Sequence, residues 1–196
     1  QSALLEAMEE GQVTVDGVSH PVPQPFLVIA TQNPAGASGT QLLPDSQMDR
    51  FMVRLSIGYP APADEVAMVR RRQGANPLNQ VGQVLDLEGL RELRDRADRV
   101  YVSDEVLDYV IRLVNATRSH PMIVQGGSPR ASLALTAMSK ATALAVGRDY
   151  VNPEDVAAVF ADVITHRLIL SPRAQAEGGF HPAAEILRQV PAPTVR

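Results

Sequence analysis

The segment Phe26-Leu-Val-Ile-Ala-Thr-Gln-Asn-Pro34 indicates the fold class, because an apolar, β-branched run ends abruptly in polar side chains. This pattern is typical of a buried strand whose carboxyl end lies at the ligand-binding edge of an open α/β sheet. A second stretch, Leu43-Pro-Asp-Ser-Gln-Met-Asp-Arg-Phe51, places Arg50 between a short predicted helix and another apolar run, residues 51–57. Together the two stretches predict half of a nucleotide site, without the loop that holds the phosphates.

Composition excludes several classes of protein. The 196 residues are 45% hydrophobic and 20% charged, as in ordinary globular proteins, and the net charge of −4 gives no general attraction to nucleic acid or anionic membrane. The chain has no cysteine and no apolar run long enough to span a bilayer. We therefore expect a cytoplasmic protein with no membrane span and no nucleic-acid partner.

Basic residues are almost all arginine: 17 of 18, with Lys140 as the only lysine. A Walker A loop needs Gly-Lys-Ser/Thr, whereas Lys140 lies in an alanine-rich helical stretch, so the sequence contains no P-loop. The chain also opens at Gln1 inside a predicted helix, residues 2–10, which suggests a piece of a longer protein.

Turn residues divide the chain into two predicted domains. Gly11 ends the first helix, and Asp16-Gly17 predicts a type I′ hairpin with Val15 opposite Val18. The run Gly58-Tyr-Pro-Ala-Pro62 marks a boundary between an α/β part, residues 1–58, and a part over residues 59–196 in which we expect helices and no sheet.

Helix starts in the second part are predicted from their caps. These are Asp86, Ser103, Ser128-Pro129 and Asn152-Pro153. For the helix after Ser128 the spacing predicts a buried stripe of Leu133, Ala137, Ala141 and Leu144, and a last helix is expected over residues 182–189.

Three side chains are candidates for phosphate chemistry. Asn33, at a strand end, can orient a water or contact a phosphate oxygen, although Asn-Pro can also simply start a turn. Arg50 can act as an arginine finger on a transferring phosphoryl group, or form a structural ion pair beside Asp49. Arg130 lies in the first turn of a helix, where a cation opposes the macrodipole unless an anion shares the site; the alternative is an exposed surface arginine.

Other polar residues receive simpler interpretations. The four histidines, His20, His120, His166 and His181, form no i, i+4 pair, so we expect no metal site. His166-Arg167 is interpreted as compensation of a helix dipole, and Glu9-Glu10 as the polar end of the first helix.

Several long motifs occur in a characteristic order. They are residues 1–10, Val28-Ile-Ala-Thr-Gln-Asn-Pro34, Leu43-Pro-Asp-Ser-Gln-Met-Asp-Arg-Phe51, Gly58-Tyr-Pro60, Ser128-Pro-Arg-Ala-Ser-Leu133 and His166-Arg-Leu-Ile-Leu-Ser-Pro172. In these motifs and their order the chain resembles the MoxR family of AAA+ ATPases, from end to end. A small departure is Gly39-Thr40-Gln, where the family often has an aromatic residue after the threonine.

The resemblance implies the fold and the roles of the candidates. Residues 1–58 would be the C-terminal part of an AAA+ P-loop core, with a sensor 1 strand, a β-hairpin insert and one further strand, and residues 59–196 an all-α lid. Asn33 matches sensor 1, which positions the attacking water. Arg50 matches the arginine finger, which acts on ATP held by a neighbouring subunit, and Arg130 matches sensor 2.

Family members hydrolyse ATP with Mg²⁺ in rings, commonly hexamers. They are thought to mature partner proteins or load metal cofactors into them, often partners with a von Willebrand factor A domain. Without a P-loop, the 196 residues alone are expected to be inactive and to bind ATP weakly. The alternative is a non-catalytic lid module that binds partner proteins. A DNA-remodelling motor is disfavoured, since the hairpin of residues 12–20 has no lysine or arginine to contact phosphates.

Overall fold

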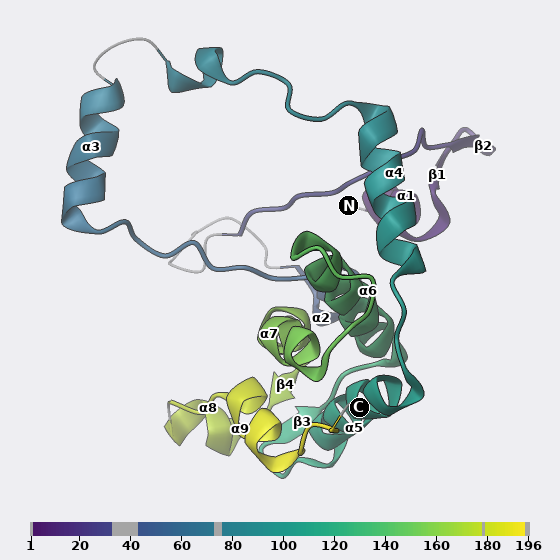
Figure 1. Ribbon diagram of the computed structural model, residues 1–196, viewed down its shortest axis with the longest axis vertical. Coiled ribbons are helices and arrows are strands. Elements are labelled where there is room, and N and C mark those ends of the chain that lie inside the picture. Colours follow the sequence, from purple (N-terminus) through teal and green to yellow (C-terminus); the bar gives the residue numbers. More distant parts are fainter. Residues whose placement is uncertain (1, 33–42, 73–75, 178, 195–196) are drawn as a thin grey trace.

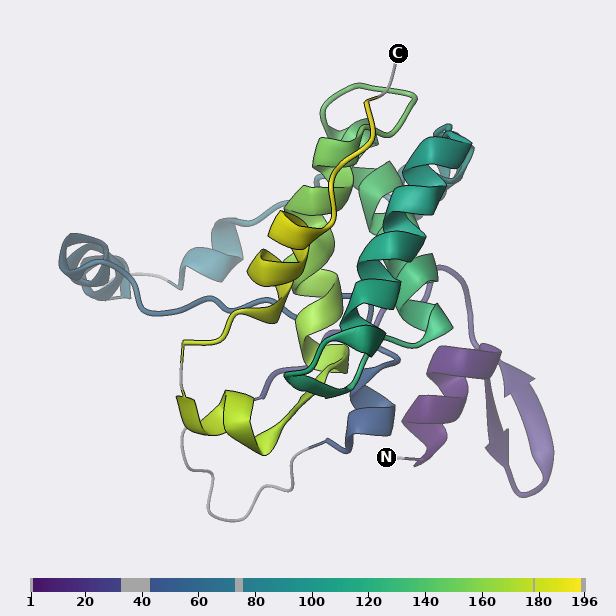
Figure 2. The same cartoon turned by 90° about the horizontal axis from the view of Figure 1, so that it is seen from below.

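The helical body of the protein is built from four helices that pack around one core. The computed structural model describes residues 2–32, 43–72, 76–177 and 179–194. Helices α5 (Asp104–Ser119), α6 (Pro129–Ala145), α7 (Pro153–Ile164) and α9 (Pro182–Gln189) form this body (Figures 1 and 2). Its largest fully buried side chains are Phe160, Leu113, Leu135, Ile164 and Ile186.

Side-chain caps start the helices at the predicted residues. The Ser103 hydroxyl accepts a hydrogen bond from the Val106 N–H, and the Asp86 carboxylate accepts one from Gly89 at the start of α4 (Leu87–Arg99). At the start of α7 the Asp155 carboxylate accepts from the Asn152 N–H at 2.8 Å, which completes a capping box. Each cap satisfies donors that a helix start leaves unpaired. These predictions are confirmed.

The predicted core face of α6 is wrong. Leu133 is 73% exposed, whereas Leu135, two residues later, is fully buried. The buried face is made largely of small residues: Ala131, Ala134, Leu135, Ser139 and Ala143. The faces of an alanine-rich helix differ little in hydrophobicity, so the spacing of apolar residues alone does not identify the buried face.

A small sheet in the second part of the chain was also not expected. β3 (Ile123–Gln125) pairs antiparallel with β4 (Ile169–Leu170), and α8 (Pro172–Glu177) follows directly. Strands of three and two residues are too short to show an alternating pattern. A 3₁₀ turn, η2 (Thr165–Arg167), connects α7 to β4.

The amino-terminal elements form as predicted. Helix α1 (Ser2–Glu10) ends at Gly11, whose φ is +64°. β1 (Gln12–Val15) pairs with β2 (Val18–Pro21), with Val15 opposite Val18. Asp16 and Gly17 both have positive φ, 50° and 79°, as a type I′ turn requires.

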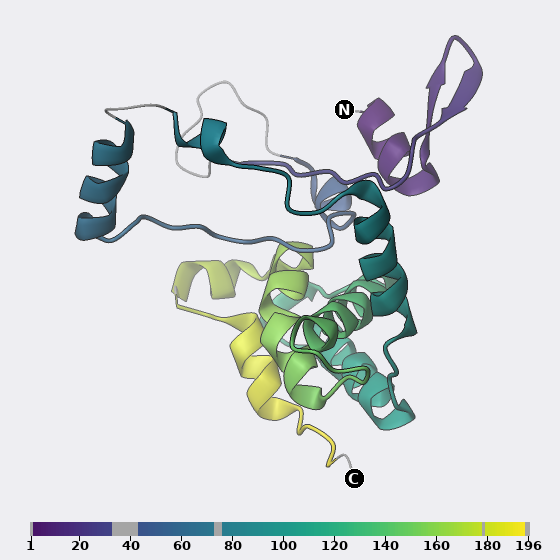
Figure 3. The ribbon, with the colours of Figure 1, turned by 45° about the horizontal axis from the view of Figure 1, so that its top comes forward.

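The two predicted core strands are not strands among the described residues. The segments 26–32 and 51–57 have no ladder partner, and Leu27 and Ile57 are 79% and 99% exposed. A strand needs a hydrogen-bonded neighbour, and the described part of the chain supplies none. Figure 3 draws both segments as coil, without strand arrows. The second segment leads from α2 (Asp45–Met48) to α3 (Pro62–Arg72). The described fold is therefore mixed α/β and mostly helical.

An excursion of the chain carries α3 and the 3₁₀ helix η1 (Pro77–Gln80) away from the helical body (Figure 1). None of the residues of these two helices that the structure describes is buried. Among the described residues, no helix is both long enough and apolar enough to cross a membrane.

Gly126 provides a test of the packing before α6. A Cβ on Gly126 would lie 2.6 Å from the Arg118 backbone nitrogen, and backbone cannot easily yield. Gly126→Ala should lower the free energy of unfolding by about 1–3 kcal/mol. Gly82→Ala is the matched control, because a Cβ there meets nothing within 4 Å. Urea unfolding of both variants measures the difference; equal stabilities would contradict the described packing.

Candidate functional site

Arg50 lies in the turn after α2, where its backbone N–H donates to the Gln47 carbonyl at 3.2 Å. Its guanidinium forms an ion pair with Glu9, the penultimate residue of α1. The side chain is only 24% exposed, and its buried Nε has no hydrogen-bond partner in the described structure. Arg50 is therefore directed at α1 with one donor left unpaired.

Arg130 reaches the same carboxylate from the start of α6. Its Nη2 donates to Glu9 Oε1, whereas Arg50 pairs with Glu9 Oε2. Its Nη1 also lies 3.7 Å from Asp49 Oδ2. The Ser128 hydroxyl accepts from the Arg130 N–H and donates to Asp49 at 2.9 Å. The helix start thus binds the residue that precedes Arg50.

These side chains line a shared cavity. Met8, Glu9, Arg50 and Arg130 surround a volume of about 380 Å³. The sequence therefore identified two cations that lie together in space, although 80 residues separate them in the chain. The interpretation of Glu9 as merely the polar end of a helix is incomplete, because Glu9 joins both arginines.

A buried ion pair holds this cavity in place. Arg167, whose side chain is 2% exposed, donates from Nε to Asp49 Oδ1 at 3.2 Å. It also donates from Nη2 to the Phe51 carbonyl at 2.6 Å and from Nη1 to the Met52 carbonyl at 3.2 Å. Burial lowers the pKa of Arg167, and Asp49 opposes that shift. Arg167 therefore fastens residues 49–52 to the helical body, which corrects its interpretation as dipole compensation.

His166 makes a second link to the same segment. Its Nε2 lies 2.9 Å from the Phe51 carbonyl, which can only accept, so Nε2 carries the proton. Nδ1 is buried without a partner in the described structure. Burial lowers the pKa of His166, the Phe51 carbonyl opposes this shift, and the neighbouring Arg167 reinforces it. The lowered pKa favours the neutral ring at pH 7.

Asn33, the third predicted site residue, lies outside the described residues, so its predicted role stays a prediction.

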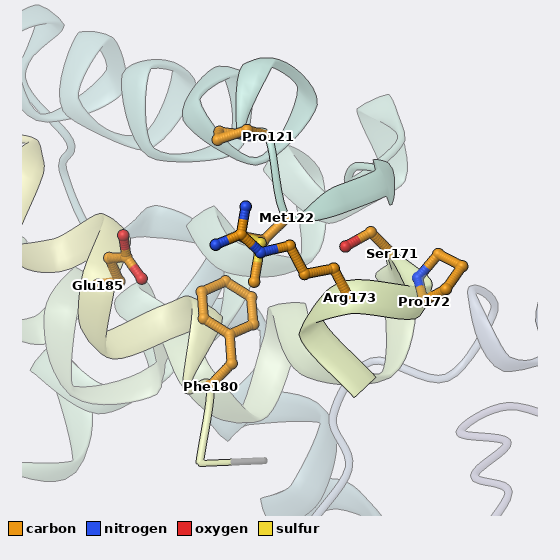
Figure 4. Close-up of a pocket in the computed structure, with 7 residues that line it drawn as sticks. All are labelled: Pro121, Met122, Ser171, Pro172, Arg173, Phe180 and Glu185. Carbon is orange, nitrogen blue, oxygen red and sulfur yellow. The ribbon is translucent and has the colours of Figure 1, made fainter. Parts of the chain in front are cut away.

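A second cavity, of about 730 Å³, lies elsewhere on the helical body (Figure 4). Its lining includes Met122, Phe180, Arg173 and Glu185, and it contains none of the predicted site residues. Glu185 pairs there with His120, whose Nε2 is 3.3 Å away. The cavity with both predicted arginines is the candidate functional site.

Comparisons with known proteins identify the family. The family model described as "ATPase family associated with various cellular activities (AAA)" matches residues 1–53, and the AAA lid domain matches residues 115–190. Chaperone MoxR1 of Mycobacterium tuberculosis is 42% identical over 186 residues, 90% of this chain and 49% of that protein. The chain belongs to the MoxR family of AAA+ ATPases.

Two further proteins are similar to this chain. The uncharacterized protein YeaC of Bacillus subtilis is 40% identical over 178 residues, 91% of this chain and 56% of that protein. The crystal structure of a candidate ATPase from Cytophaga hutchinsonii matches with a TM-score of 0.90 at 38% identity, covering 98% of this chain and 62% of that one. The chain spans about half the length of these curated relatives.

The neutral His166 predicts how stability depends on pH. Because its pKa is lower in the folded than in the unfolded chain, the unfolded state binds the proton first as the pH falls below about 6.5. The free energy of unfolding should therefore decrease between about pH 6.5 and the lower folded pKa. His166→Gln, which keeps a donor for the Phe51 carbonyl, should flatten this dependence, and the exposed His181→Gln should not. Thermal unfolding across this range checks the prediction; equal slopes in both variants would refute it.

Proposed function

We propose that this chain is part of an ATP hydrolase in which Arg50 and Arg130 contact the terminal phosphates of one ATP. The observation that carries the proposal is that both guanidiniums bind one carboxylate at one cavity. Two convergent cations suit a transferring phosphoryl group, whose negative charge lies on several oxygens. Following the family resemblance, Arg50 is the arginine finger, Arg130 is sensor 2, and Asn33 positions the attacking water.

The remaining parts of the site are assigned to the longer protein. The chain matches 56% and 49% of two longer relatives, which leaves room for a phosphate-binding loop and for strands that pair with residues 26–32 and 51–57. ATP hydrolysis requires Mg²⁺ in this family. Among the described residues, no three His, Asp or Glu side chains gather where they could hold a metal ion, so we assign none of them to Mg²⁺.

The wider role that we propose is chaperone-like maturation of partner proteins, or metal-cofactor loading, by a hexameric ring. The name of the M. tuberculosis relative, Chaperone MoxR1, supports this. Proteins with a von Willebrand factor A domain are the partners implied by the family. Capture of such proteins from native extract by the full-length protein tests this part.

A non-catalytic lid module is the second candidate. The ion pairs of Arg50 and Arg130 with Glu9 are compatible with it as well, because the same contacts would form if the arginines were only structural. The two candidates differ in what happens to turnover when an arginine is removed.

Arg50→Ala separates these candidates in the full-length ring. If Arg50 stabilises the transition state, kcat should fall by roughly 10³-fold or more while ATP binding changes little. Arg54→Ala is the matched control, because Arg54 is exposed and lies in the same segment. A turnover of Arg50→Ala equal to that of Arg54→Ala would reject the finger role and favour the structural one.

Binding measurements test what the 196 residues do alone. Because the chain has no Walker A loop, calorimetry with ATP and Mg²⁺ should detect no binding in the micromolar range. Micromolar affinity would show that the 196 residues suffice to hold the nucleotide.

A further inference from the structure

We propose that Glu9 is a resident anion, which occupies the phosphate position between Arg50 and Arg130 until a terminal phosphate of ATP displaces it. The inference rests on the proposed function and adds a role that neither the motifs nor the comparisons assign. Glu9 is thereby a positioning residue for the two arginines.

The division of the contacts supports this role. Each carboxylate oxygen of Glu9 takes one arginine, Oε2 from Arg50 and Oε1 from Arg130. Two oxygens of a phosphoryl group can bridge two guanidiniums in the same way. A terminal phosphate offers a third oxygen and more negative charge, so it can replace a single carboxylate.

The positions of these residues in their helices also require an explanation. Glu9 lies in the last turn of α1, which contains no basic residue, and Arg130 lies in the first turn of α6, which contains no acidic one. Each charge is at the end of its helix that the macrodipole disfavours. Pairing Glu9 with Arg130 offsets both penalties, and a phosphate near Arg130 would offset the second equally well.

Glu9 can leave while Arg130 keeps a second carboxylate partner. Its side chain is 32% exposed, so the carboxylate has access to solvent. Arg130 retains Asp49 at 3.7 Å, and the buried Arg167 holds Asp49 in place. After Glu9 leaves, the cluster of Arg50, Arg130, Arg167 and Asp49 has three positive charges against one negative charge, which favours an incoming anion.

Inorganic phosphate is the probe for the test, applied to the 196-residue chain, which has no P-loop to bind it elsewhere. Glu9→Gln keeps the size of the side chain and removes the competing charge. By calorimetry the variant should bind phosphate at least fivefold more tightly than the wild type. Glu10→Gln is the matched control: Glu10 is adjacent and exposed and bonds only to the Gln12 side chain among the described residues, so wild-type affinity is expected.

A second measurement uses the unaltered chain and needs no variant to fold. Phosphate titration followed by NMR should shift three sets of signals together: the Nε–Hε signals of Arg50 and Arg130 and the carboxyl carbon signal of Glu9. The chemical shift of the Glu9 carboxyl carbon should move towards the value of a solvent-exposed glutamate. Phosphate affinity in Glu9→Gln equal to or weaker than wild type, or a Glu9 carboxyl signal unmoved at saturation, would overturn the proposal. Neither readout involves hydrolysis, so these results are separate from the Arg50→Ala turnover test of the proposed function.

Discussion

The buried contact between Arg167 and Asp49 is the constraint on which the candidate site depends. A guanidinium with 2% exposure is costly unless its donors are satisfied, and here they bind the Asp49 carboxylate and carbonyls of residues 49, 51, 52 and 163. These acceptors fix the segment after α2 on the helical body. Arg50 lies inside that segment, so its position beside α6 follows from Arg167, with which it shares no hydrogen bond or ion pair in the described structure.

This arrangement makes Arg50 and Arg130 one structural unit. Ser128 is the link, because its hydroxyl caps α6 through the Arg130 N–H and donates to Asp49 with the same oxygen. A displacement of the helical body relative to other parts of an assembly would therefore carry both arginines together. The backbone bond from the Arg54 N–H to the Asp162 carbonyl, 2.9 Å long, strengthens the same attachment.

The sequence predicted the helix caps and the hairpin turn well, because both depend on residues close together in the chain. Caps and the Asp16-Gly17 turn depend on residues within four positions of one another, so their chemistry is visible in the sequence. The Arg167–Asp49 and Arg130–Glu9 contacts join residues 118 and 121 positions apart, which no spacing rule anticipates. The apolar runs at 26–32 and 51–57 have strand character, but pairing depends on neighbours that the described chain does not provide.

The side-chain contacts of the site arginines explain the excess of arginine over lysine. Arg130 spans two carboxylates, and Arg167 distributes its donors over one carboxylate and several carbonyls. A planar fork with five donors can do this, whereas an ammonium is a point charge. Lys140 shows the contrast: its ammonium donates to a single acceptor among the described residues, the Asp98 carbonyl, at 2.8 Å. Replacing either site arginine by lysine would keep the charge and lose the bridging, and the proposed exchange of a carboxylate for a phosphate requires the bridging.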